Sequence, residues 1–223
     1  MIDDLYTVKS APGRPEADDA PSPRKPGGYH HGDLRGALLR AAEEVIRERG
    51  VDDFSLREAA RRAGVSAAAP QHHFGDARGL LTAVATLGFE DLSAALANAD
   101  ARAQAGSDAP ANRRARLEAQ GRAYVAYALA EPARFDVMWR KARIDDADAT
   151  FQAAAQRTYR VLDEAVRGEA AVGLTDGPPD PRTIAAWAAV HGFARLALDG
   201  AFGPDPKAAA DAMLDGVLTR LDF

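Results

Sequence analysis

The sequence predicts an all-α protein, and three observations lead to this fold class. From residue 33 onward, apolar residues recur at three- and four-residue spacing, which is the period of an amphipathic helix. The alternation of apolar and polar residues that marks a half-buried strand is absent. Alanine, leucine, arginine and glutamate, which are good helix formers, are abundant. With 47% hydrophobic residues, a chain of 223 residues can bury a sizeable core.

The first segment, residues 1–28, is expected to be a disordered arm. It holds five prolines among scattered Asp, Ser and Gly residues. Such a segment cannot bury enough apolar surface to offset the entropy lost on ordering. It also lacks the basic start and the apolar stretch of a signal peptide. We therefore expect a cytoplasmic protein.

The first two helices are predicted from capping residues and glycines. One covers residues 33–49, starting at an aspartate that is a good N-cap, and Gly50 ends it. A second, short helix follows Ser55, because Ser55 and Glu58 form the S-x-x-E capping box, and it ends at Gly64.

The third and fourth helices follow from the same kinds of signal. After a tight Gly-Val-Ser turn, Ser66 is expected to cap a third helix that runs to Phe74. Gly75 suits a left-handed exit from that helix, and Asp76 is expected to cap a long helix over residues 77–105.

The rest of the chain is also predicted to be helical. Residues 106–112 form a loop, and residues 173–181 separate the last pair of helices from those before them. The span 184–202 is interrupted by charged residues and a histidine, so no membrane crossing is expected. The helices predicted in this part cover residues 113–130, 133–143, 147–167, 181–200 and 206–221.

The short second and third helices, with the longer helix before them, have the arrangement of a helix-turn-helix. Small residues are needed where the two short helices approach each other, and Ala59, Ala60, Ala63 and Gly64 meet that need. The second short helix of such a motif enters the DNA major groove. The alternative is a protein-interaction module without sequence-specific DNA binding, and steep salt dependence would distinguish DNA binding from it.

Four stretches carry a family resemblance, and they occur in order and without gaps over residues 28–82. They are Gly28-Tyr29-His30-His31-Gly32-Asp33-Leu34, Ser55-Leu56-Arg57-Glu58-Ala59-Ala60, Ala63-Gly64-Val65-Ser66 and His73-Phe74-Gly75-Asp76. Together they resemble the DNA-binding domain of TetR-type regulators. In addition, Trp187, His191 and Gly192 resemble the Trp-x-x-x-His-Gly signature of one C-terminal subclass.

The resemblance implies a homodimer with a three-helix DNA-binding domain at residues 29–76. Residues 77–223 would form a larger helical domain that binds a small-molecule effector, still unidentified, and dimerises through its last two helices. Effector binding would change the spacing of the two recognition helices and release a palindromic double-stranded DNA operator. The chain would then be a repressor. Its half-sites must lie about one helical turn, or a multiple of it, apart.

The residues expected to contact DNA lie on and around the two short helices. Ala67 and Ala68 let the recognition helix come close to base edges, and Gln71 can pair with adenine through its amide. By the family pattern His73 contacts a backbone phosphate, whereas His72 varies and faces the groove. Before the first helix, Arg24 and Lys25 either reach the DNA or form a solvated pair. The remaining residues of the expected interface are Tyr29, Ser55, Arg57, Ser66 and Arg78.

Three positions depart from the family pattern. Pro70 stands where an apolar Leu or Ile is usual, and Gln71 stands where Tyr is usual. Because proline lacks an N–H group, we expect an irregular start to the recognition helix. Ala77 stands where Lys is common, and Arg78 is the candidate to replace it.

No catalytic or metal-binding constellation is present. The chain has no cysteine, which excludes disulfides, thiol catalysis and thiolate metal sites. The pairs His30-His31 and His72-His73 are adjacent rather than one helical turn apart, so no metal site is expected. A Gly-rich phosphate loop, a nucleophile elbow and an HExxH motif are all missing, and no cofactor or enzymatic activity is expected.

Two groups of residues are candidates in the C-terminal part. Effector pockets are lined mostly by apolar and aromatic groups, although aromatic residues on helices can equally be ordinary core. The pocket candidates are Tyr124, Tyr127, Phe135, Met138, Trp139, Phe151 and Tyr159. The stripe formed by Trp187, His191, Gly192 and Arg195 suits a dimer interface, or else His191 is a core histidine bonded to a backbone group.

The net charge of −5 argues against a nucleic-acid partner only while it is averaged over the whole chain. Residues 24–81 carry 10 basic and 8 acidic residues, whereas residues 82–223 carry 16 and 20. The positive block coincides with the predicted DNA-binding domain. Its excess is small, which predicts weak non-specific affinity and reliance on two copies per dimer.

Overall fold

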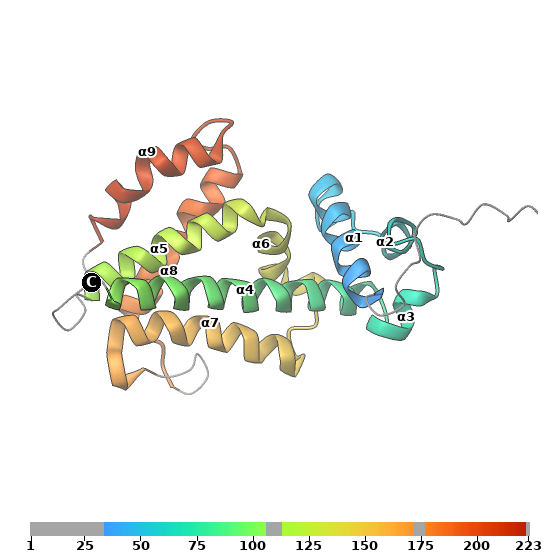
Figure 1. The fold of residues 1–223 in the computed structure, drawn as a ribbon, viewed down its shortest axis with the longest axis horizontal. Coiled ribbons are helices and arrows are strands. Elements are labelled where there is room, and N and C mark those ends of the chain that lie inside the picture. Colours follow the sequence, from blue (N-terminus) through green and yellow to red (C-terminus); the bar gives the residue numbers. More distant parts are fainter. Residues whose placement is uncertain (1–33, 106–112, 172–176, 222–223) are drawn as a thin grey trace, which may run out of the picture. The chain divides into compact units, whose positions relative to one another are not determined.

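The computed structural model describes residues 34–105, 113–171 and 177–221, and every regular element in them is a helix (Figure 1). The all-α prediction is confirmed. In chain order the elements are α1 (Leu34–Arg49), α2 (Leu56–Arg62), α3 (Ala69–Phe74), α4 (Ala77–Ala105), α5 (Arg113–Ala130), α6 (Pro132–Met138), the 3-10 helix η1 (Lys141–Arg143), α7 (Ala149–Arg167), the 3-10 helix η2 (Gly168–Ala170), α8 (Pro181–Leu198) and α9 (Pro206–Leu218). The predicted arm, the cap at Asp33 and the residues Arg24, Lys25, Tyr29, His30 and His31 lie outside the described residues.

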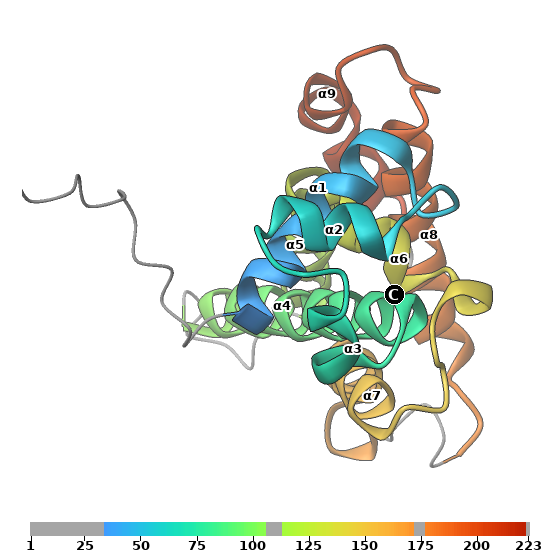
Figure 2. The ribbon, with the colours of Figure 1, turned by 90° about the vertical axis from the view of Figure 1, so that its right-hand side faces the viewer.

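The first helices pack onto one end of an apolar core that continues through α4 to α9. α1 contributes Leu38, Ala42 and Val45, all fully buried, because apolar residues at three- and four-residue spacing line one side of the helix. Val51 and Phe54, from the α1–α2 connection, also belong to this core. Figure 2 looks onto α1, α2 and α3. The domain boundary at residue 76 stays a prediction, because Asp33–Phe223 forms one compact unit.

α4 is the central helix of the larger part, and it lies between α5 and α7 (Figure 1). α6 also packs on α4, while α8 and α9 pack on α5 and on each other. By length and composition α4 could cross a membrane, but 61% of its most apolar window is buried inside the protein. It is therefore best understood as the core helix of this bundle, and not as a membrane span.

Aspartate side chains begin several of these helices, as N-capping predicts. The Gly79 N–H donates to Asp76 at 2.8 Å at the start of α4. The side chains of Asp148, Asp180 and Asp205 likewise accept from backbone N–H groups at the starts of α7, α8 and α9. These local bonds explain why the sequence locates these starts to within about two residues.

Several predicted helices begin or end elsewhere, and the last two end at Leu198 and Leu218 instead of residues 200 and 221. α3 starts at Ala69, and Ser66 does not cap it: the N-cap is Ala68, without a side-chain hydrogen bond. Pro70, which has no N–H to donate, occupies the first turn, so the irregular start expected from the sequence is confirmed. The helix predicted over residues 133–143 ends at Met138, because the chain turns at Arg140 (φ −90°, ψ 65°) before η1.

Candidate nucleic-acid interface and ligand cavity

The α2–α3 pair has the close packing that a helix-turn-helix needs. Ala59 and Ala60 are buried on α2, and Ala63 ends that helix. Gly64 follows with a φ of +71°, a conformation that favours glycine. The Ser55 hydroxyl accepts a 3.4 Å hydrogen bond from the Glu58 N–H, which is one half of the predicted capping box. Ser55 thereby holds the start of α2 in place.

The outer side of the turn and α3 forms a continuous exposed strip. Pro70 is the buried residue of α3, and the Arg35 guanidinium lies over the Phe74 ring, 5.5 Å from its centre. Pro70 thus fills an apolar position even though it shortens the helix. The exposed residues, which we call the recognition edge, are Ser66, Ala67, Ala68, Gln71, His72 and His73.

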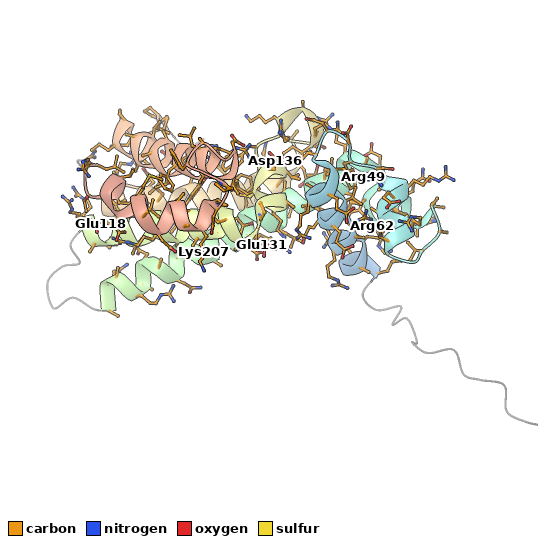
Figure 3. All side chains as sticks on the ribbon, turned by 90° about the horizontal axis from the view of Figure 1, so that it is seen from above. Arg49, Arg62, Glu118, Glu131, Asp136 and Lys207 are labelled. Atoms are coloured by element: carbon orange, nitrogen blue, oxygen red, sulfur yellow. The ribbon has the colours of Figure 1, made fainter. Side chains whose placement is uncertain are left out.

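The arginines of α2 differ in how they are engaged. Arg61 and Arg62 both donate to Glu58, and Arg62 also binds Glu48 on α1. These bonds lower the pKa of the Glu58 carboxyl to about 2, so it stays charged at neutral pH. Figure 3 labels Arg62 on this part of the molecule. Arg57 is exposed on the same helix, which makes it the α2 arginine best placed to reach a phosphate.

Arg78 is exposed, and it also makes a bond within the chain. Its Nε donates a 2.8 Å hydrogen bond to the carbonyl of Ile144, in the connection between η1 and α7. Nearby, the Thr82 hydroxyl accepts a 2.8 Å bond from the Asp145 N–H. The first turns of α4 are therefore tied to the 139–146 segment, and this bond directs Arg78 toward that segment.

A cavity of about 430 Å³ lies among α4, α5, α7 and α8. Five of the predicted pocket residues line it: Tyr124, Met138, Trp139, Phe151 and Tyr159. Two do not. The Phe135 ring is completely buried in the core, and Tyr127 is buried with its hydroxyl 4.0 Å from the Met138 sulfur.

Sequence reasoning missed much of the cavity wall. Phe89, Leu92 and Leu96 belong to the buried side of α4 and line the cavity, as do Gln120 on α5 and Trp187 on α8. Periodicity identifies Leu92 and Leu96 as buried, although not Phe89, and it cannot distinguish a cavity wall from solid core. Which buried residues face empty space depends on how the helices pack.

Trp187 and His191 face inward, which differs from the dimer interface expected for them. The Trp187 indole donates a 3.4 Å hydrogen bond to the Tyr124 hydroxyl, and that hydroxyl is 2.9 Å from His191 Nδ1. Since the hydroxyl accepts from Trp187, it is free to donate to Nδ1, which then carries no proton. Burial and the nearby Arg195 charge lower the pKa of His191, which favours the same neutral form. His191 is therefore a core histidine, but its partner is the Tyr124 side chain and not the backbone group expected from the sequence.

The outer side of α8 carries a different stripe. Ile184, Ala188 and Leu196 are exposed at four-residue spacing, with Gly192 between the last two. A methyl group added at Gly192 would meet nothing within 4 Å, so this part of the helix faces open space. Arg195 lies beside the stripe and binds Asp136 and Asp199. We call Ile184, Ala188, Gly192 and Leu196 the α8 outer face.

No group of three or more His, Asp or Glu side chains that could hold a metal ion occurs among the residues that the structure describes. The adjacent histidines His72 and His73 are both exposed on α3.

Family models match both parts of the chain. Residues 38–84 match the model described as bacterial regulatory proteins, tetR family, which spans α1 to the first turns of α4. Residues 117–220 match the model described as tetracyclin repressor-like, C-terminal domain. The chain belongs to the TetR family. Its members are DNA-binding transcriptional regulators and not enzymes, and the α2–α3 pair is the DNA-binding motif of this TetR protein.

Solved structures share the TetR fold over most of their length. A protein of unknown function from a Rhodococcus species is 36% identical, with a TM-score of 0.61 over 86% of this chain and 97% of that one. The TetR family transcriptional regulator PfmR from Thermus thermophilus is 21% identical, with a TM-score of 0.60 over 83% and 99%. The fatty acid degradation regulator FadR from Bacillus halodurans is 14% identical, with a TM-score of 0.58 over 84% and 99%.

No curated protein matches this TetR chain by sequence. The matched C-terminal model is described only as tetracyclin repressor-like, so the Trp-x-x-x-His-Gly subclass stays a prediction. In this TetR protein, the tryptophan and histidine of that signature join Tyr124 beside the cavity, while its glycine lies on the α8 outer face.

Proposed function

We propose that the protein is a repressor that binds a palindromic operator as a homodimer and leaves it when a small molecule enters the cavity. The observation that carries this proposal is the segment of residues 139–146, between α6 and α7. This segment contributes to the cavity wall and also bonds to the first turns of α4, which follow directly on the recognition helix α3.

The recognition edge supports the DNA-binding step. Its small residues Ala67 and Ala68 allow α3 to approach base edges, while Gln71 is exposed and able to pair with adenine. His73, also exposed, is the candidate for a phosphate contact. A dimer presents two such edges, and two half-sites one helical turn apart would engage both.

The 139–146 segment supports the release step. Trp139, Lys141 and Asp146 line the cavity, whereas Ile144 and Asp145 in the same segment bind Arg78 and Thr82 on α4. A ligand that moves the wall therefore moves the segment that holds the first turns of α4. Because α4 follows α3 after a short turn, such a shift would reorient α3 relative to its partner in the dimer.

Two further ties connect this region to the DNA-binding helices. Arg143 donates a 3.0 Å hydrogen bond to the Asp52 carbonyl in the α1–α2 connection. On α6, Arg134 binds Glu43 of α1 at 2.7 Å and also Asp91 of α4. Such bonds couple the cavity to the DNA-binding helices only if they change between two conformations of the protein. The proposal therefore includes one conformation that binds the operator and another that binds the ligand.

The α8 outer face supports the dimer. Of the large apolar side chains in the described residues, the most exposed are Ile184, Leu196, Phe202 and Met213, all on α8, α9 or the loop between them. Large apolar side chains exposed on two consecutive helices are typical of a site of protein association. With a two-fold axis beside α8, the same patch would meet its own copy.

Binding to the DNA upstream of its own gene tests the proposal. A gel shift with competitor DNA is expected to show a preferred sequence, and affinity for it is expected to fall steeply as salt rises. If no sequence is preferred over random DNA, the repressor proposal is wrong. Binding to a partner protein that does not depend on salt would instead indicate the alternative function, a protein-interaction module without sequence-specific DNA binding.

Gln71→Ala and His73→Ala are expected to act in different ways. The first should cost about 1–3 kcal/mol per half-site only on operators that carry the contacted base, because it removes a base contact. The second should weaken binding to all operator variants by a similar factor, because it removes a phosphate contact. Fluorescence anisotropy over a set of operator variants measures both. Equal losses across the set for both changes would contradict this division of roles.

Thr82→Val is expected to weaken the link between ligand and operator without removing either binding activity. Valine keeps the shape of threonine but cannot accept the Asp145 N–H, so the 139–146 segment loses one bond to α4. Operator affinity without ligand and ligand affinity without DNA should stay within about threefold of the original, while the ligand-induced loss of operator affinity shrinks several-fold.

Arg78→Gln provides a second test of the same link. If Arg78 acts through Ile144, its substitution should reduce the response to ligand, as Thr82→Val does. If Arg78 instead contacts phosphate, operator affinity should fall in the absence of ligand and the response should be unchanged. The second result would restore the role expected from the sequence.

A further inference from the structure

The first turn of α1 lies beside the recognition helix α3 (Figure 1 and Figure 2). It carries Arg35, whose guanidinium carbon is 5.5 Å from the centre of the Phe74 ring. Phe74 is the last residue of α3, and its ring centre is 6.2 Å from the ring centre of His73 on the recognition edge. Arg35 therefore lies close to the recognition edge, although it belongs to another helix.

The contact with Phe74 leaves the hydrogen-bond donors of Arg35 available. Attraction between a cation and an aromatic ring is electrostatic and needs no hydrogen bond. Arg35 is exposed, and among the residues that the structure describes no hydrogen bond or ion pair engages its guanidinium. Arg61 and Arg62 on α2, by contrast, already donate to Glu58. Arg35 can therefore offer its N–H donors to a partner outside the chain without breaking a bond.

The position of Arg35 in α1 is not explained by the stability of that helix. Arg35 lies in the first turn of α1, whereas Arg47 lies in its last turn. The partial positive charge at the start of a helix repels cations, and the partial negative charge at its end attracts them. Arg47 is therefore favourable to α1, whereas Arg35 is not. An anion bound to Arg35 would offset this unfavourable effect.

We propose that Arg35 binds a backbone phosphate of the operator, with the Phe74 ring holding its guanidinium beside the recognition edge. The planar guanidinium presents paired N–H donors that match two phosphate oxygens. A side chain that is already held in place loses less conformational entropy when it binds. Because a phosphate carries no base identity, Arg35 would position α3 on the DNA without reading its sequence. This inference rests on the proposed function, since it adds a contact to the same DNA-binding surface.

Arg35→Gln tests this inference on the full chain by fluorescence anisotropy at a series of salt concentrations. Removing one phosphate contact from each bound protomer should weaken binding roughly tenfold, by a similar factor for every operator variant. The slope of log affinity against log salt concentration should become less steep by about 1 for each bound protomer, because one phosphate fewer is neutralised. Arg35→Lys keeps the charge and should retain most of that slope.

Arg47→Gln is the matched control, because it removes the same charge from an exposed position of the same helix. Arg47 lies about 18 Å further along α1, which is beyond the distance over which exposed charges interact at ordinary salt concentrations. The control should change operator affinity by less than about threefold and leave the salt slope almost unchanged. In urea unfolding, Arg35→Gln should have a midpoint close to that of the original protein, because an exposed cation–π contact contributes little to stability.

Phe74→Leu tests whether the ring acts through Arg35. Alone, this change should weaken operator binding, because Arg35 loses the surface that holds it. In the Arg35→Gln background the same change should cost clearly less, since no guanidinium is left to hold. Equal costs in both backgrounds would contradict the role given to the ring. If Phe74→Leu does not fold, the comparison of Arg35→Gln with Arg35→Lys decides.

The inference is overturned if Arg35→Gln weakens binding with an unchanged salt slope, because Arg35 would then act only on the placement of α3. It is also overturned if Arg35→Gln and Arg47→Gln change the affinity equally, or if the original protein binds no DNA at low salt. A duplex of random sequence separates the inference from the repressor proposal, because phosphate contacts do not depend on sequence. A protein that prefers no operator would contradict the repressor proposal, yet Arg35→Gln should still make the salt dependence on the random duplex less steep.

Discussion

Leu196→Arg is expected to convert the proposed dimer into a monomer and to lower operator affinity by about 10²- to 10⁴-fold. Leu196 is 48% exposed on the α8 outer face, where its neighbours at four-residue spacing are glycine, alanine and isoleucine. A two-fold interface would place two introduced arginines close together, without an acidic partner on the stripe. The affinity loss follows because a dimer holds its second half-site at high effective concentration, whereas a monomer must bind each half-site alone.

Light scattering after size-exclusion chromatography measures the oligomeric state, and anisotropy with an operator and an isolated half-site measures the affinity. Ala153→Arg is the matched control, since it adds the same side chain at an exposed position on α7. The control should remain dimeric. Half-site affinity should be nearly unchanged in Leu196→Arg, because the recognition edge is distant in the chain and untouched. A Leu196→Arg protein that remains dimeric would show that the interface lies elsewhere.

Much of the fold is predictable from the sequence because its signals are local. Asp76, Asp148 and Asp205 accept hydrogen bonds from backbone N–H groups within three residues, so their identity alone indicates a helix start. Glycines with positive φ, such as Gly64 and Gly75, end helices for an equally local reason. Where the local signal conflicts with packing, the prediction fails. Ser66 is a good cap by type, but α3 begins at Ala69.

The site was predictable in part for the same reason. Aromatic residues of α5 to α7 could be named as candidates, but membership of the cavity wall depends on contacts between residues far apart in sequence. Arg78, for example, is held by a carbonyl 66 positions away. On α8, a stripe of four-residue spacing exists on both sides of the helix, and only the packing of Tyr124 against Trp187 and His191 shows which side is inward.

Gly79→Ala is expected to destabilise the protein and to abolish tight operator binding, although Gly→Ala in a helix usually stabilises by about 0.5–1 kcal/mol. Gly79 is in the first turn of α4, where a Cβ would lie 1.9 Å from the Phe74 carbonyl oxygen at the end of α3. Phe74 cannot move independently: its carbonyl accepts from the Asp76 N–H at 2.9 Å, across a tight turn at Gly75 with a φ of +75°.

The added methyl group must therefore separate α3 from α4 or break the Asp76 cap on the Gly79 N–H. We expect a loss of about 1–3 kcal/mol in the free energy of unfolding and at least a hundredfold loss in operator affinity, because base contacts in both half-sites are misplaced. Urea unfolding and anisotropy measure the two effects.

Gly88→Ala is the matched control on the same helix. Its Cβ would meet the Met138 side chain, with the sulfur at 2.7 Å and Cγ at 2.8 Å, whereas no backbone atom of α3 is among its neighbours. Operator affinity should then change by less than about threefold, even though the ligand cavity is altered through Met138. If Gly79→Ala bound the operator as well as Gly88→Ala, the close approach of α3 and α4 would not be what positions the recognition edge. If only Gly79→Ala loses operator affinity, the contact between Phe74 and Gly79 is what passes a movement of α4 on to the recognition helix α3.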